Sequence, residues 1–267
     1  MPVKHNVVVK QITENEFYSL DYKIMELVFS VHKDLGRFYD EKIYQNELAY
    51  RCKKLGIEKV ETEIPIQVSY KDFTKYYYMD LLVNNSVIYE LKTVQALTGK
   101  HQKQTLNYIL IVGMRHGKLV NMRTSSVQHR FVSTNLTTKE RYKFTIDDRE
   151  WNELDKDSIW LKQLMENLLA EWGAFLDTNL FYSAVKHFRG AKENLIQKIK
   201  IMNDSRILGT QKVHLLNSEI AFKISAVTND AYFYEEHLKK FLNHTSMKAI
   251  QWINFNHGKI IFKTIFR

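Results

Sequence analysis

The chain has 267 residues, of which 45% are hydrophobic and 26% are charged, so it can bury the core of one large domain or two smaller ones. Its single cysteine, Cys52, excludes an intrachain disulfide, the first eleven residues lack the apolar stretch of a signal peptide, and no apolar run is long enough to span a bilayer. We therefore expect a soluble cytoplasmic protein without a membrane partner. The net charge of +9 favours a polyanionic partner such as nucleic acid.

The N-terminal half alternates between helical and extended patterns. Apolar spacing predicts a helix over residues 15–35, and Asp40 can cap a second helix. Three stretches rich in β-branched and aromatic residues follow, then a helix that Thr98 can cap and a short strand. The predicted ranges after the first helix are 41–55, 60–70, 76–83, 87–92, 99–112 and 118–122. This order predicts an α/β protein with a mixed sheet packed by helices.

The polar tract over residues 125–148 has few core signals, so we place a domain boundary at its start. The predicted domains are residues 1–125 and 126–267. The second domain is predicted to be helical at first and then α+β. Its helices are predicted over residues 151–177 and 180–201, and a mixture of strands and a helix follows. The basic residues of its second helix can hold nucleic acid, a partner protein or only water; they are Lys186, His187, Arg189, Lys192, Lys198 and Lys200.

Asp80, Glu90 and Lys92 carry the strongest chemical signal. Asn84-Asn85-Ser86 reads as a tight turn between two short strands, so a hairpin would place Asp80 beside Glu90. Side chains alternate along a strand, which puts Glu90 and Lys92 on one face. Two carboxylates suit a hard cation such as Mg²⁺, and a lysine beside it can orient water or stabilise phosphate charge. The alternative is a solvated hairpin edge with a surface ion pair.

Several separated blocks in the N-terminal half resemble the GxxExxY proteins, a branch of the PD-(D/E)XK nuclease superfamily. In chain order the blocks are Val31-His32-Lys33-Asp34-Leu35-Gly36, Glu41-Lys42-Ile43-Tyr44, Leu48-Ala49, Glu63-Ile64-Pro65, Asp80-Leu81-Leu82-Val83, Glu90-Leu91-Lys92, Leu97-Thr98, His101 and Gln104-Thr105-Leu106-Asn107-Tyr108. Two positions depart from the pattern. Phe38 stands where the signature has its first glycine, and Met79 stands where the superfamily name has proline.

The resemblance implies a restriction-endonuclease-like αβββαβ core, followed here by a C-terminal α+β extension. It implies that Asp80 and Glu90 are metal ligands and that Lys92 is the catalytic lysine. Together with the Leu91 carbonyl, these carboxylates would hold Mg²⁺ or Mn²⁺. Glu41 matches the signature glutamate, which can complete a metal shell; it can equally stabilise the first turn of its helix.

The helix after the hairpin supplies further candidates. His101, Gln104 and Tyr108 share one helical face, and the family motif places Gln104 and Tyr108 near the active site. We expect Gln104 to steer the substrate and His101 and Tyr108 to contact it, although the same face can simply pack on the sheet. Lys100 and Lys103 can form a rim that follows the phosphates, or only a solvated face.

The first hypothesis is a Mg²⁺- or Mn²⁺-dependent nuclease that hydrolyses phosphodiester bonds, with DNA favoured over RNA. The alternative is a non-catalytic nucleic-acid-binding or regulatory module that retains the nuclease fold, since the C-terminal half has no assigned role. A third hypothesis gives the helical half a protein-interaction role, including homodimerisation.

Overall fold

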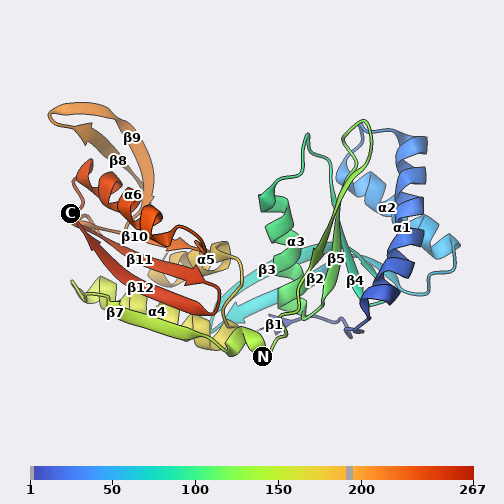
Figure 1. The fold of residues 1–267 in the computed structure, drawn as a ribbon, viewed down its shortest axis with the longest axis horizontal. Coiled ribbons are helices and arrows are strands. Elements are labelled where there is room, and N and C mark those ends of the chain that lie inside the picture. Colours follow the sequence, from blue (N-terminus) through green and yellow to red (C-terminus); the bar gives the residue numbers. More distant parts are fainter. Residues whose placement is uncertain (1–2, 191–194) are drawn as a thin grey trace. The chain divides into compact units, whose positions relative to one another are not determined.

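A computed structural model describes residues 3–190 and 195–267 and divides the chain into two compact units, Met1–Thr138 and Lys139–Arg267. The described residues form six α-helices and three sheets (Figure 1), which is the mixed α/β class that the sequence predicts. The first unit extends past residue 125 because residues 128–133 form a strand that pairs with the strand before it. No helix in the described ranges is both long and apolar enough to cross a membrane.

Unit 1 is built on a six-stranded sheet in which the strands follow chain order, β1 to β6. The strands are Val3–Lys4, Val60–Tyr70, Phe73–Val83, Val87–Lys92, His116–Asn121 and Gln128–Ser133. Only β4 and β5 run parallel, since α3 (Gly99–Val112) connects them; the other neighbours are antiparallel. Helices α1 (Glu14–Leu35) and α2 (Glu41–Lys54) lie on one side of the sheet and α3 on the other (Figure 1).

The core of unit 1 lies between the sheet and the α1–α2 pair. Apolar side chains of both helices pack against alternate residues of the central strands, including Leu81, Tyr89 and Leu91. Alternation along β4 then directs Glu90 and Lys92 to the opposite face, where α3 lies. The fold therefore places two charged residues of a fully buried strand under a helix.

The predicted turn between β3 and β4 is present. Asn84 and Asn85 adopt φ values of 50° and 56°, the left-handed conformation that asparagine tolerates best among non-glycine residues. The register pairs Val83 with Val87 and Leu81 with Tyr89, so Asp80 comes next to Glu90.

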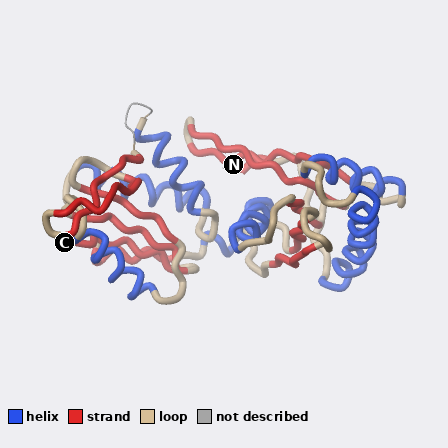
Figure 2. Tube along the Cα trace, turned by 90° about the horizontal axis from the view of Figure 1, so that it is seen from above, coloured by secondary structure: helices blue, strands red, loops and turns tan. Residues whose placement is uncertain are grey.

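Unit 2 contains a four-stranded sheet in the order β10-β11-β12-β7 and a separate two-stranded ribbon, β8–β9. Its elements are β7 (Thr145–Glu150), α4 (Lys156–Trp172), α5 (Thr178–Arg189), β8 (Ile196–Asn203), β9 (Arg206–His214), β10 (Ile220–Ser225), α6 (Ala231–Asn243), β11 (Ala249–Asn256) and β12 (Lys259–Phe266). Helices cover both faces of the four-stranded sheet (Figure 2). Phe181 of α5 meets Phe255 on one face, and Tyr234 of α6 stacks on Trp252 on the other.

The helix predicted over residues 180–201 is wrong beyond Arg189. Helix α5 ends at Gly190, whose φ of +95° favours glycine, and residues 196–203 form a strand. The basic residues assigned to one helix are therefore split. Lys186, His187 and Arg189 lie on α5, Lys198 and Lys200 lie on β8, and Lys192 is outside the described residues.

Candidate active site in the N-terminal unit

The ammonium of Lys92 lies at the centre of a cluster of oxygen atoms. Its Nζ is 3.0 Å from Glu90 Oε1, 3.5 Å from Asp80 Oδ2 and 3.4 Å from Glu41 Oε1. It also donates a hydrogen bond of 2.6 Å to the Leu91 carbonyl. Five of the residues singled out from sequence thus meet at one point, contributed by α2, β3 and β4. Lys92 itself is buried.

Asp80 is fixed by the backbone of the neighbouring strand. Its Oδ2 accepts a 2.8 Å hydrogen bond from the Leu91 N–H. Burial raises the pKa of Asp80 to about 6, while the Lys92 ammonium acts in the opposite direction. The same oxygen therefore faces both a backbone donor and the lysine.

Glu90 is the most deeply buried acid of the cluster, with 1% of its surface exposed. Burial, and then the nearby Asp80 carboxylate, raise the pKa of Glu90 to about 8. Burial lowers the pKa of Lys92, but the charges of Glu90, Asp80 and Glu41 outweigh it and raise the pKa above its ordinary value. Lys92 thus stays charged and compensates the acids around it.

Gln45, which the sequence analysis did not single out, contacts the backbone of Asp80 from helix α2. Its Nε2 donates a hydrogen bond to the Asp80 backbone carbonyl. Burial acts to raise the pKa of Glu63, but the neighbouring Gln45 and Lys42 side chains outweigh it and lower the pKa. Strands β2 and β3 pair at Thr62–Leu81 and at Ile64–Met79, on either side of Asp80. Glu63 between them has a φ of 55°.

The distortion at Glu63 lets a helix side chain reach the backbone of β3 in the middle of the sheet. A glutamine one helical turn after Glu41, on the same face of α2, is the only sequence signal that could have indicated this contact.

The predicted helical face of α3 reaches the site through two of its residues. Gln104 Nε2 donates hydrogen bonds of 3.1 Å to Glu90 Oε1 and 2.9 Å to the Tyr108 hydroxyl. Burial, followed by the charge of Glu90, raises the pKa of Tyr108 to about 12, so its hydroxyl stays protonated. Gln104 therefore connects α3 to the buried carboxylate.

The other α3 candidates lie outside this hydrogen-bonded cluster. His101 Nδ1 accepts a 3.1 Å hydrogen bond from the Thr98 backbone N–H, which caps the helix. Burial lowers the pKa of His101, and the charges of Lys92 and Lys100 lower it further. Lys100 and Lys103 are exposed on the helix surface.

The donor atoms fit a hard divalent cation. Carboxylates and a backbone carbonyl are the oxygen ligands that Mg²⁺ and Mn²⁺ take. Glu90 Oε2 is buried and has no hydrogen-bond partner among the described residues, a costly arrangement that a cation would relieve. No group of three or more His, Cys, Asp or Glu side chains in residues 3–190 and 195–267 is arranged as a metal site by itself. The carboxylates converge on Lys92 instead.

Comparison with known proteins bears on the same segment. Residues 18–132 match the family model of the PD-(D/E)XK nuclease superfamily. Unit 1 therefore contains a segment that is similar to the PD-(D/E)XK nuclease superfamily. No protein with a curated description and no solved structure matches the chain.

The PD-(D/E)XK match includes every residue of the Lys92 cluster and ends within β6. The superfamily is named after a proline and an aspartate, followed on the next strand by an aspartate or glutamate and, two residues later, a lysine. Asp80, Glu90 and Lys92 have that spacing, with Met79 at the position of the proline. PD-(D/E)XK nucleases act on nucleic acids and typically use divalent metals.

Proposed function

We propose that unit 1 is a Mg²⁺- or Mn²⁺-dependent nuclease that hydrolyses phosphodiester bonds, with DNA preferred over RNA. The observation that carries the proposal is the convergence of Asp80, Glu90 and Lys92 within 3.5 Å, inside a segment that matches a nuclease superfamily. A hairpin edge with a surface ion pair would leave these groups in water, whereas here Glu90 and Lys92 are buried.

In this proposal Asp80, Glu90 and the Leu91 carbonyl would hold the metal, and Glu41 would complete the shell. The bound cation would acidify a water molecule and offset negative charge on the phosphate. Lys92 is the catalytic lysine: its ammonium can orient the attacking water or stabilise a phosphate oxygen. Gln104 orients Glu90 through its hydrogen bond and faces the substrate.

The substrate side is formed by α3. Lys100 and Lys103 are exposed cations on the first two turns of the helix that covers the site, where they can contact backbone phosphates. Tyr108 contacts Gln104 and His101 lies in the first turn of α3, and we assign both residues contacts with the nucleotide next to the cleaved bond.

We further infer that unit 1 is of GxxExxY type. Glu41 begins α2 and lies 3.4 Å from Lys92, which supports a role for the signature glutamate in the site itself. The elements α2, β2, β3, β4, α3 and β5 correspond to the αβββαβ core in this proposal, and unit 2 is the C-terminal extension. With this assignment we also propose a cytoplasmic location and a homodimer.

One observation favours a second candidate, a non-catalytic nucleic-acid-binding module. The Lys92 ammonium already lies against three carboxylates, so the cluster has a cation of its own. A retained fold whose lysine replaces the metal would bind nucleic acid without cleaving it.

Cleavage assays separate the two candidates. The full chain is incubated with labelled single- and double-stranded DNA and RNA in Mg²⁺, in Mn²⁺ and in EDTA. The nuclease proposal expects cleavage that requires metal and falls by about three orders of magnitude in Asp80→Asn, a loss of about 4 kcal/mol of transition-state stabilisation. Asp34→Asn removes a carboxylate that is paired with Arg51 away from the cluster and serves as the control. Equal cleavage by wild type and Asp80→Asn would overturn the proposal.

A further inference from the structure

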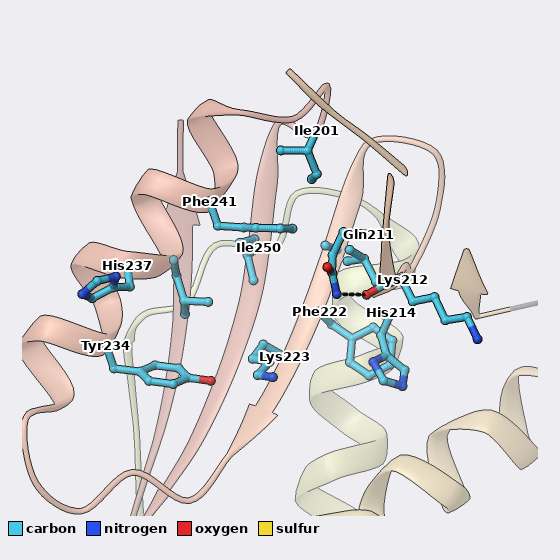
Figure 3. Close-up of a pocket in the computed structure, with 13 residues that line it drawn as sticks. Ile201, Gln211, Lys212, His214, Phe222, Lys223, Tyr234, His237, Phe241 and Ile250 are labelled. Carbon is cyan, nitrogen blue, oxygen red and sulfur yellow. Dashed lines mark hydrogen bonds between the residues drawn. The ribbon is translucent and has the colours of Figure 1, made fainter. Parts of the chain in front are cut away.

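The β8–β9 ribbon of unit 2 has one basic face and one face of isoleucine, valine and glutamine side chains. Its register pairs Ile199 with Gln211 and Gln197 with Val213, so these residues share one side. That side borders a cavity of about 510 Å³ between the ribbon, the sheet and α6. Figure 3 shows Ile201 and Gln211 directed into the cavity, opposite Phe241. Lys212 also lines the cavity, but its side chain extends away from it.

The other side of the ribbon concentrates positive charge. Lys198 lies directly opposite Lys212, and Lys200 follows on the same face. Like charges directly opposite one another on neighbouring strands destabilise a sheet. No carboxylate of the described residues forms an ion pair with any of these three lysines, although ion pairs are frequent elsewhere in unit 2.

The charge imbalance extends along the whole ribbon. Residues 196–214 contain Lys198, Lys200, Arg206 and Lys212 but a single acid, Asp204 in the turn. Nearly all of β9 is exposed. The arrangement keeps unfavourable repulsion on an exposed face, which a polyanion would relieve.

The ribbon is nevertheless held firmly close to its turn. The Met202 N–H donates 2.9 Å to the His244 carbonyl, and the His244 ring contacts the Met202 carbonyl at 2.8 Å. Ile199 belongs to the core that α6 forms with the sheet. The three lysines therefore project from a supported strand pair, which Figure 1 shows as an arm curving past α6.

We propose that the β8–β9 ribbon is an arm that binds duplex DNA, with Lys198, Lys200 and Lys212 on backbone phosphates. A two-stranded ribbon fits the B-DNA major groove, which is about 12 Å wide, and nine residues of strand extend about 30 Å along it. The deep, narrow major groove of A-form RNA does not admit such a ribbon. The choice of DNA rests on the proposed nuclease function, but binding through the arm needs neither metal nor cleavage.

The test measures binding of the full chain to a fluorescent 20-base-pair DNA duplex in EDTA, over a series of salt concentrations. A triple variant, Lys198→Gln with Lys200→Gln and Lys212→Gln, removes the three charges. Its control removes three charges from other exposed positions of unit 2: Lys156→Gln, Lys248→Gln and Lys259→Gln. Circular dichroism and thermal unfolding of both variants confirm that the fold is intact.

We expect the ribbon variant to lose affinity on the order of 100-fold at 0.1 M salt, and the slope of log affinity against log salt to fall by about 2.7 for three phosphate contacts. The affinity of the control variant for the DNA duplex should change by less than about threefold. The affinity of the ribbon variant for duplex RNA should also change by less than about threefold. Equal losses in the two variants would overturn the proposal. So would a ribbon variant that binds DNA normally but no longer binds vesicles of anionic phospholipid, because the arm would then serve a membrane surface. Since no cleavage is measured, an inactive unit 1 leaves this result interpretable.

Discussion

Lys92 and Glu90, two residues apart on β4, form a buried ion pair in which Nζ lies 3.0 Å from Oε1. Their side chains share the face of the sheet that α3 covers, where Gln104 also bonds to Glu90. Asp80 and Glu41 lie on the same ammonium. In the proposed mechanism Lys92 therefore has two roles: it compensates buried acids in the metal-free protein, and it would act on the phosphate when a metal is bound.

If Lys92 compensates the buried carboxylates, a bound metal ion should partly replace its contribution to the stability of the fold. Lys92→Met leaves buried carboxylates without a cation, so the free energy of unfolding in EDTA should fall by about 3–5 kcal/mol. Millimolar Mn²⁺ should restore more stability to the variant than to wild type. Urea unfolding with and without Mn²⁺ measures both effects. Lys100→Met, on the exposed surface of α3, should change stability by less than about 0.5 kcal/mol; a comparable loss in both variants would contradict the account.

Gln45 is predicted to be a positioning residue for Asp80. Gln45→Ala removes the hydrogen bond to the Asp80 carbonyl, and outer-shell partners of metal ligands typically change affinity or activity by about 10–100-fold. The concentration of Mn²⁺ that gives half-maximal cleavage should rise by that factor. Asn46→Ala, the exposed neighbour on α2, is the matched control. A Gln45 variant that loses only stability, with an unchanged Mn²⁺ requirement, would show a purely structural role.

Gln104 is predicted to matter more than Tyr108. Gln104→Leu removes the donor to Glu90 Oε1, whereas Tyr108→Phe removes only the second partner of that amide. Cleavage should fall about 10–100-fold in the first variant and only a few-fold in the second. Gln102→Leu, two residues away on another face of α3, should leave the rate unchanged. The reverse order of effects would indicate that the tyrosine contacts the reacting groups directly.

A second buried charge pair in unit 1 is predicted to act on stability alone. Lys118 Nζ lies 2.6 Å from Asp21 Oδ2, and the Tyr89 hydroxyl donates to Asp21 Oδ1. Lys118→Met should cost about 3–5 kcal/mol because it leaves a buried carboxylate unpaired, and Tyr89→Phe about 1 kcal/mol. Cleavage per folded molecule should stay at the wild-type level in Tyr89→Phe. A large loss of activity there would extend the site to the α1 face of the sheet.

The centre of the candidate site could be predicted from sequence because its causes are local. Asn84 and Asn85 tolerate the left-handed turn, and alternation along β4 then fixes the faces of Glu90 and Lys92. Gln45 could not be found in this way. Its contact with Asp80 depends on how α2 docks on the sheet and on the distortion at Glu63, which no local pattern encodes.

For the β8–β9 ribbon of unit 2 the sequence prediction was wrong, because local patterns favoured a helix there. Residues 198–201 alternate polar and apolar side chains with the period of a strand, yet the preceding residues continue a helical pattern. Gly190, which ends α5, was the signal against a continuous helix. Lys198 and Lys200 therefore lie on a two-stranded ribbon and not on a helix, and the proposed DNA-binding arm depends on that position.

The most direct test of the central claim is a crystal of the full chain soaked in Mn²⁺ and measured at an anomalous wavelength for manganese. We expect a peak within about 2.1–2.3 Å of carboxylate oxygens of both Asp80 and Glu90, with the Lys92 ammonium displaced from between them, and no peak in Asp80→Asn. A fully formed Lys92 cluster without manganese at millimolar concentration would contradict it.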